Sequence, residues 1–103
     1  MAESILPPET CETMADVRAG VDALDAALVR LLARRFGYMR AAARIKPERG
    51  HVRDEARKAI VIDNAEALAS ELGIPAGLVA QLWEQLVEAS IAYELEAWDV
   101  QRG

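Results

Sequence analysis

Two cationic side chains occupy positions where an apolar pattern calls for apolar residues. Apolar residues recur at alternating steps of three and four from Val17 to Leu31, and the same steps then reach Arg35 and Lys46. On a helix these two cations are three turns apart on one face, with Cα atoms about 16 Å apart. Two long cations leaning inward from there could grip one small anion. The alternative is that Arg35 lies at the edge of the stripe and extends into solvent.

A serine and a glutamate break the apolar pattern near the end of the chain in a similar way. Ser90 and Glu94 follow Leu82 and Leu86 at steps of four, which places all four on one helical face. A carboxyl group on an apolar face is costly to bury unless it pairs with a cation or carries a proton. The alternative is a carboxylate at the rim of the face that bridges to a neighbouring cation.

Arg18 lies too far along the chain to join this group within one molecule. It precedes Arg35 by 17 residues, which is about 25 Å on a helix. If two copies pair antiparallel about residues 29–30, Arg18 of one copy comes to lie between Arg35 and Lys46 of the other. Two-fold pairing is the commonest form of oligomer. The spacing therefore predicts a homodimer with two composite cationic pockets, each suited to a small dianion.

Three helices have to position these side chains. The pattern predicts helices over residues 13–46, 54–72 and 76–100, joined by a polar connection at 46–55 and a turn at 74–75. Pro47 ends the first helix and Gly73 ends the second. The first helix, about 50 Å long, exceeds what a globule of this size can cover. The expected fold class is all-α, with three helices, one very long, intertwined as a two-fold helical-bundle dimer.

One helical domain is expected over residues 13–103, after a flexible tail at residues 1–12. Pro7 and Pro8 oppose a helix in the tail, whose polar residues cannot bury much area. Thr13 or Asp16 is expected to cap the first helix. The apolar faces expected for the second and third helices comprise Val61, Ala65, Leu68 and Leu72, and Val79, Leu82, Trp83, Leu86, Val87, Ile91 and Trp98.

Composition argues against several classes of protein. With 12 basic and 17 acidic residues, the net charge of −5 is unfavourable for binding nucleic acid or an anionic membrane. No apolar run reaches the ~20 residues of a membrane span, and no secretory signal is present, so the cytoplasm is the expected location. The single cysteine, Cys11, excludes an intramolecular disulfide and a multi-cysteine zinc site.

No arrangement typical of metal, cofactor or covalent chemistry stands out in the sequence. It contains no activated Cys–His or Ser–His pair, no metal-ligand spacing and no phosphate-binding glycine loop, and its one histidine, His51, lies in the polar connection. Neither a metal nor a cofactor is therefore expected. Any catalysis would have to come from positioning and electrostatics.

Three stretches of the chain resemble the all-helical chorismate mutases: VRAGVDALDAALVRLLARRFGYMRAAARIKP, VRDEAR and LWEQLVEASIAYELEAW. The resemblance covers about residues 11–98. It is nearest to the subgroup with the isochorismate-pyruvate lyase of salicylate biosynthesis, which shares the short Cys-containing lead-in. It implies an intertwined helical dimer that converts chorismate to prephenate. The alternatives are an isochorismate-pyruvate lyase and, from another class, a non-catalytic helical dimerisation or regulatory module.

The resemblance also implies a set of substrate contacts. The residues it assigns are Arg18 from the partner, Arg35, Lys46, Asp54, Arg57, Ser90 and Glu94. The arginines and Lys46 would hold the substrate carboxylates and ether oxygen, Asp54 would lie near the ring hydroxyl, and Ser90 would be a further contact. Arg35, Lys46 and Glu94 form the expected catalytic set, in which Glu94 donates a hydrogen bond to the ether oxygen.

Two positions depart from the family pattern. Lys58 stands where many mutases have a glutamate, which bears on recognition of the ring hydroxyl. The lyase relative carries glutamine where this chain has Glu94. The connection at residues 47–53 is expected to order over bound substrate.

Overall fold

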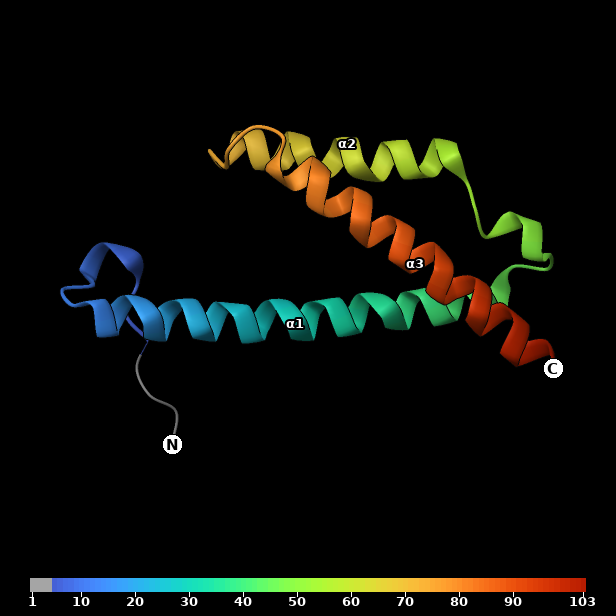
Figure 1. The fold of residues 1–103 in the computed structure, drawn as a ribbon, viewed down its shortest axis with the longest axis horizontal. Coiled ribbons are helices and arrows are strands. Elements are labelled where there is room, and N and C mark those ends of the chain that lie inside the picture. Colours follow the sequence, from blue (N-terminus) through green and yellow to red (C-terminus); the bar gives the residue numbers. More distant parts are fainter. Residues whose placement is uncertain (1–4) are drawn as a thin grey trace. The chain divides into compact units, whose positions relative to one another are not determined.

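The structure, a computed structural model, describes residues 5–103. Its helical segments are the 3-10 turn η1 (Pro8–Thr10), α1 (Met14–Ile45), the 3-10 turn η2 (Arg49–His51), α2 (Glu55–Glu71) and α3 (Leu78–Arg102) (Figure 1). No β-strand occurs in this part of the chain, which confirms the all-α class with one very long helix. None of the described helices is both long and apolar enough to cross a membrane.

The chain forms two compact units, and the division falls within α1. The N-terminal unit is Met1–Arg35 and the C-terminal unit is Phe36–Gly103. The N-terminal unit therefore contains η1 and the first part of α1, whereas the C-terminal unit contains the last part of α1 with η2, α2 and α3.

Thr13 and Asp16 together cap the start of α1. Thr13 Oγ1 accepts a hydrogen bond from the backbone N–H of Asp16 at 3.1 Å. Asp16 Oδ2 in turn accepts from the backbone N–H groups of Glu12 at 3.0 Å and Thr13 at 3.1 Å. These backbone donors lower the pKa of Asp16. Both predicted caps are therefore in use, as the two sides of one reciprocal capping box.

The segment before α1 turns beside the helix. Pro8 begins η1, where a missing backbone N–H costs no helical hydrogen bond. The segment and the first turns of α1 enclose an apolar pocket of about 440 Å³, lined by Ile5, Leu6, Pro7, Pro8, Cys11, Val17, Gly20, Val21 and Leu24. Residues 1–4 of the predicted tail lie outside the described residues, and the flexibility of the tail stays a prediction.

The apolar stripe of the N-terminal unit is exposed. Met14, Val17, Val21, Leu24, Leu28 and Leu31 are between 39% and 64% exposed. Burying an apolar side chain of this size typically stabilises a protein by about 1.5–3 kcal/mol. The predicted periodicity is therefore present, but a single chain does not gain the stabilisation that burial of these residues would give.

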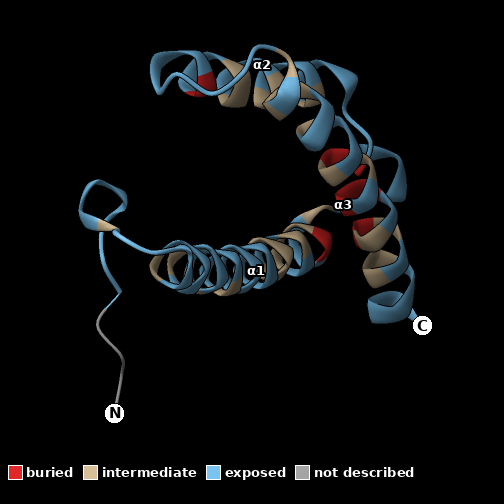
Figure 2. Ribbon diagram, turned by 60° about the vertical axis from the view of Figure 1, so that its left-hand side comes forward, coloured by how far each residue is buried: buried red, intermediate tan, exposed pale blue. Residues whose placement is uncertain are grey.

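A small core holds the C-terminal unit together. Val52 from the connection meets Val87 and Ile91 of α3 there, and the partly buried hydrophobic residues around them are Val61, Ile62, Trp83, Leu95 and Trp98. In Figure 2, α3 carries several buried positions, coloured red. Leu68, Leu72 and Leu82 are more than half exposed, so the expected burial of these three residues is wrong for the single chain. The expected burial of Val87 and Ile91 is confirmed. Two packed helices, α2 and α3, can bury only the sides that face each other, so apolar residues on their other sides stay exposed.

Two glycines and a glutamate shape the turn between α2 and α3. Gly73 and Gly77 adopt left-handed backbone angles, with φ of 75° and 84°. Because Gly77 is left-handed, α3 begins at Leu78 rather than at the expected residue 76. Glu66 of α2 accepts hydrogen bonds from the backbone N–H groups of Gly77 at 2.8 Å and Ala80 at 3.1 Å. The carboxylate satisfies donors at the positive end of α3 and ties it to α2.

Candidate active site

The structure brings Lys46 and Glu94 together. Lys46 directly follows α1, and Glu94 is on α3. Lys46 Nζ lies 2.7 Å from Glu94 Oε2, and the glutamate side chain is only 6% exposed. The approach is an ion pair by distance, although Oε2 receives no well-directed hydrogen bond from the described residues. The predicted burial of Glu94 on the apolar face of α3 is thus confirmed, and its compensating cation is Lys46.

Other groups hold the backbone of Lys46. Its carbonyl oxygen accepts hydrogen bonds from Trp98 Nε1 at 3.1 Å and from Arg102 Nη2 at 2.7 Å. Arg102 Nη1 also donates to the carbonyl of Ala43 at 3.0 Å, and its guanidinium carbon lies 4.2 Å from the centre of the Trp98 ring. The carbonyls at the end of α1, which helical bonding leaves without partners, therefore receive donors from the last turns of α3.

Ser90 is buried one turn before Glu94. It is 3% exposed, and its hydroxyl donates to the carbonyl of Leu86 at 2.7 Å. The predicted sharing of one buried face by Ser90 and Glu94 is confirmed. Its contact with substrate stays a prediction.

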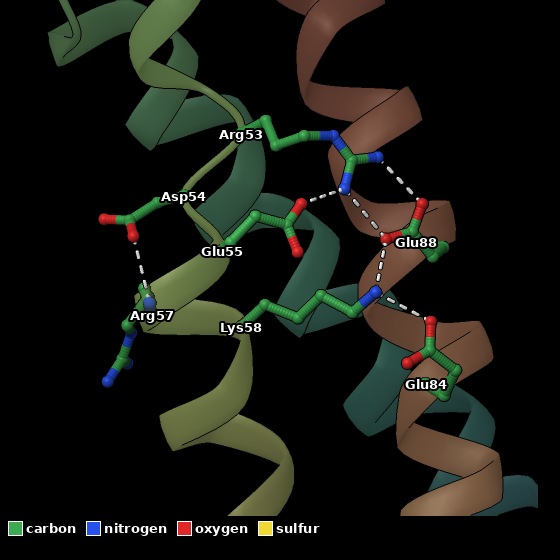
Figure 3. A network of polar contacts seen from close by, with 7 residues as sticks. All are labelled: Arg53, Asp54, Glu55, Arg57, Lys58, Glu84 and Glu88. Carbon is green, nitrogen blue, oxygen red and sulfur yellow. Dashed lines mark hydrogen bonds and ion pairs between the residues drawn. The ribbon is translucent and has the colours of Figure 1, made fainter.

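Asp54 and Arg57 meet at the start of α2. Asp54 is the N-cap, and its Oδ1 accepts a hydrogen bond from the backbone N–H of Arg57 at 2.9 Å. The Arg57 side chain is exposed, and Figure 3 shows it pointing away from the Lys58 ammonium. The cap is a structural role that Asp54 performs in addition to any contact with a ring hydroxyl.

Lys58 forms ion pairs with two carboxylates of α3. Its Nζ lies 2.7 Å from both Glu84 Oε2 and Glu88 Oε2 (Figure 3). Those hydrogen bonds, first to Glu84 and then to Glu88, raise the pKa of Lys58. The departure from the family pattern at this position therefore has a local explanation, since lysine joins α2 to α3.

Arg53 ties the connection to the same network. It donates to Glu88 Oε1 at 2.8 Å and Oε2 at 3.0 Å, and to Glu55 Oε2 at 2.7 Å. The hydrogen bonds from Arg53, followed by those from Lys58, lower the pKa of Glu88 to about 2. Arg49 makes a further exposed ion pair with Asp99 at 2.9 Å. With Val52 in the core, the connection is held at several points. Its ordering over bound substrate stays a prediction.

The two remaining predicted residues are in the N-terminal unit. Arg18 is exposed, and Arg35 is half-buried at the end of that unit. The group that the C-terminal unit itself assembles therefore consists of Lys46, Ser90 and Glu94. Cooperation of the two N-terminal arginines with this group stays a prediction.

The sequence did not reveal the supporting roles of Glu84, Glu88, Trp98 and Arg102, although Trp98 was expected on the apolar face of the third helix. Glu84 and Glu88 are four residues apart, as are Glu94, Trp98 and Arg102, and helical spacing of this kind was the available signal. It indicates which residues of α3 share a face, but not which residues of another segment they contact. Among residues 5–103, no group of three or more His, Cys, Asp or Glu side chains is arranged to hold a metal ion.

Comparison with known proteins identifies the family. The family model described as chorismate mutase type II matches residues 17–95. Isochorismate pyruvate lyase of Pseudomonas aeruginosa PAO1 is 32% identical over 96 residues, which cover 93% of this chain and 95% of the relative. The chain belongs to the type II chorismate mutase family, and its place among these enzymes confirms the resemblance found in the sequence.

Proposed function

We propose that this protein is a chorismate mutase that rearranges chorismate to prephenate. The observation that carries the proposal is the ion pair between Lys46 and the buried Glu94 in a member of this enzyme family. In the reaction the ether C–O bond breaks while a new C–C bond forms, with no net transfer of a proton. Negative charge develops on the enolpyruvate oxygen and positive charge on the ring. A fixed cation beside that oxygen lowers the barrier, because it interacts more strongly with the transition state than with the substrate.

Lys46 is the cation proposed to face the ether oxygen. Its side chain is 30% exposed, whereas its ion-pair partner Glu94 is buried, so the pair is open on the side of the lysine. Arg35 and Arg57 are proposed to hold the carboxylates of the substrate. Asp54 is proposed to lie near the ring hydroxyl, and Ser90 is proposed as a further contact.

Glu94 is proposed to donate a hydrogen bond to the ether oxygen. A carboxyl group donates only when it carries a proton. Donation by Glu94 therefore requires a protonated carboxyl group in the complex with substrate.

The first prediction follows from this role. Glu94→Gln keeps a hydrogen-bond donor at this position and should retain activity, whereas Glu94→Ala removes the donor and should lower kcat/KM. The measurement is kcat/KM for both variants, with Glu96→Gln, a change on the exposed position two residues along, as the control. Equal activity of Glu94→Gln and Glu94→Ala would remove the proposed role.

The proposed site is shared between two copies of the chain. The exposed stripe of the N-terminal unit supports a two-fold homodimer, because a second copy would cover it. In that dimer Arg18 reaches the substrate held by the Lys46 of its partner. The proposed substrate is a small dianion, and the proposed location of the reaction is the cytoplasm.

Mixing two impaired variants tests the shared site. Arg18→Ala and Lys46→Ala should each retain only a small residual activity as homodimers. After subunit exchange, half the molecules should be heterodimers, each with one intact site of two, which gives about a quarter of wild-type activity. No recovery after confirmed exchange would show that each site is built from one chain.

A second candidate is isochorismate-pyruvate lyase, and the 32% identical relative of that name favours it. This reaction is a related pericyclic elimination that releases pyruvate and salicylate. Purified protein should be incubated separately with chorismate and isochorismate. Phenylpyruvate after acid treatment reports the mutase, and salicylate fluorescence reports the lyase. Turnover of neither substrate would instead favour a non-catalytic helical module.

A further inference from the structure

The last turns of α3 contact Lys46 at both its side chain and its backbone. Glu94, Trp98 and Arg102 follow one another at steps of four, which places them along one broad face of the helix. Glu94 meets the Lys46 ammonium at 2.7 Å. Trp98 and Arg102 meet the Lys46 carbonyl at 3.1 and 2.7 Å. The side-chain ammonium and the backbone carbonyl of Lys46 are therefore both held by α3.

More than one side chain of α3 donates to the backbone carbonyls at the end of α1. Arg102 uses separate nitrogens for Ala43 and Lys46, so its guanidinium bridges two carbonyls at the end of α1. The guanidinium also stacks 4.2 Å from the Trp98 ring, which orients both donors. A cation at this end of a helix is favoured by the helix dipole.

Lys46 needs such support because it follows the last residue of α1 and precedes Pro47. Its own N–H donates to Ala42, which continues the helical pattern for one further residue. Proline then removes the next backbone donor. Without the α3 donors, the peptide that carries the lysine would be free to fray as helix ends do.

We propose that Trp98 and Arg102 are positioning residues for catalysis, which hold the Lys46 backbone so that its ammonium is presented beside Glu94. This inference rests on the proposed function of Lys46. A displacement of about 1 Å at a catalytic group can cost up to about 100-fold in rate. Loss of either donor should therefore lower kcat more than it changes KM.

The test removes the donors one at a time. Trp98→Phe keeps an aromatic ring but loses the indole N–H, and Arg102→Ala loses both carbonyl contacts. We expect kcat to fall roughly 3-fold to 10-fold for each, with KM changed less than about twofold. Asp99→Asn is the matched control, because it breaks the exposed Arg49 ion pair in the same turn without touching Lys46. Its kcat should equal that of the wild type.

A double-mutant cycle separates positioning from general stability. In the background of Lys46→Ala, whose residual rate is measured at high enzyme concentration, Arg102→Ala should cost less than about twofold, because no ammonium remains to be positioned. An equal cost in both backgrounds would overturn the proposal, as would unchanged kcat in both single variants. Should Arg102→Ala fail to fold, Trp98→Phe and Arg102→Lys carry the same cycle.

Amide hydrogen exchange measures the hold on the lysine without turnover. The N–H of Lys46 should exchange about tenfold faster in Trp98→Phe and Arg102→Ala than in the wild type, and no faster in Asp99→Asn. Faster exchange with unchanged kcat would overturn positioning while leaving the proposed function intact. A wild type that turns over neither substrate would overturn the proposed function and, with it, the catalytic part of this inference, while exchange would still report whether α3 holds the lysine.

Discussion

The N-terminal and C-terminal units use their apolar residues differently. In the C-terminal unit, Val52, Val87 and Ile91 bury one another in a core, and ion pairs join the connection and α2 to α3. In the N-terminal unit, the apolar stripe of α1 stays in solvent. The C-terminal unit is therefore stabilised by contacts within its own chain, whereas the N-terminal unit presents an apolar surface that a second copy could cover.

The two units also divide the chemistry. The C-terminal unit already pairs Lys46 with Glu94, whereas the N-terminal unit carries Arg18 and Arg35 beside the apolar stripe. If the dimer is as proposed, assembly and catalysis depend on the same stretch of α1. Charged substitutions on the apolar stripe and loss of Arg18 or Arg35 should therefore impair activity, whereas substitutions in the C-terminal core should act on folding.

The largest effect is expected from charges on the stripe. Leu24→Asp combined with Leu28→Asp should give monomers without measurable turnover, because two buried carboxylates at an apolar interface cost more than the contact supplies. Sedimentation and initial rates measure the two effects. Ala19→Asp with Ala33→Asp adds the same charge on the opposite side of α1 and should leave a dimer. A fully active monomer would refute the shared site.

Next in size is the loss of Arg35. Arg35→Ala should reduce kcat/KM by roughly 100-fold to 1000-fold, because one guanidinium no longer faces the substrate anion. Helicity and dimer mass should not change, since the position is only half-buried. Arg34→Ala, on the exposed neighbouring position, is the control. Full turnover by Arg35→Ala would favour the alternative in which this arginine extends into solvent.

A smaller effect is expected from the core of the C-terminal unit. Val52→Ala should lower the free energy of unfolding by about 1–3 kcal/mol, through lost burial and the cavity that remains. Urea unfolding at fixed protein concentration measures this change. Val100→Ala, at an exposed position near the end of α3, should change it by less than about 0.5 kcal/mol. Equal effects of the two would show that Val52 does not anchor the connection.

The smallest effect is expected from the Glu88 network. Because Arg53 and Lys58 lower the pKa of Glu88 to about 2 from an ordinary value of 4.5, their stabilisation is present above pH 4.5 and is lost as pH falls toward 2. Glu88→Gln should unfold at slightly lower urea concentration than the wild type at pH 7, and the two should converge at low pH. Added salt should reduce the difference, since the network is exposed. A difference that persists below pH 2 would exclude this origin.

Periodicity and local chemistry were sufficient to predict the three helices and the burial of Ser90 and Glu94. Steps of three and four residues, Pro47 and Gly73 led to nearly the observed bounds of α1 and α2, because these signals act over a few residues. The shared buried face of Ser90 and Glu94 followed from the same spacing. The start of α3 was placed two residues early, since the left-handed angle of Gly77 depends on how the turn returns to α2.

Only the tertiary structure decided which side chains meet across segments. It paired Glu94 with Lys46, joined Lys58 to Glu84 and Glu88, and brought Trp98 and Arg102 to the end of α1. Sequence spacing determines the faces of a helix because helical geometry is local and regular. Contacts between residues 26 to 56 positions apart depend on how whole helices pack, and this packing follows from the summed burial of many side chains rather than from any short motif.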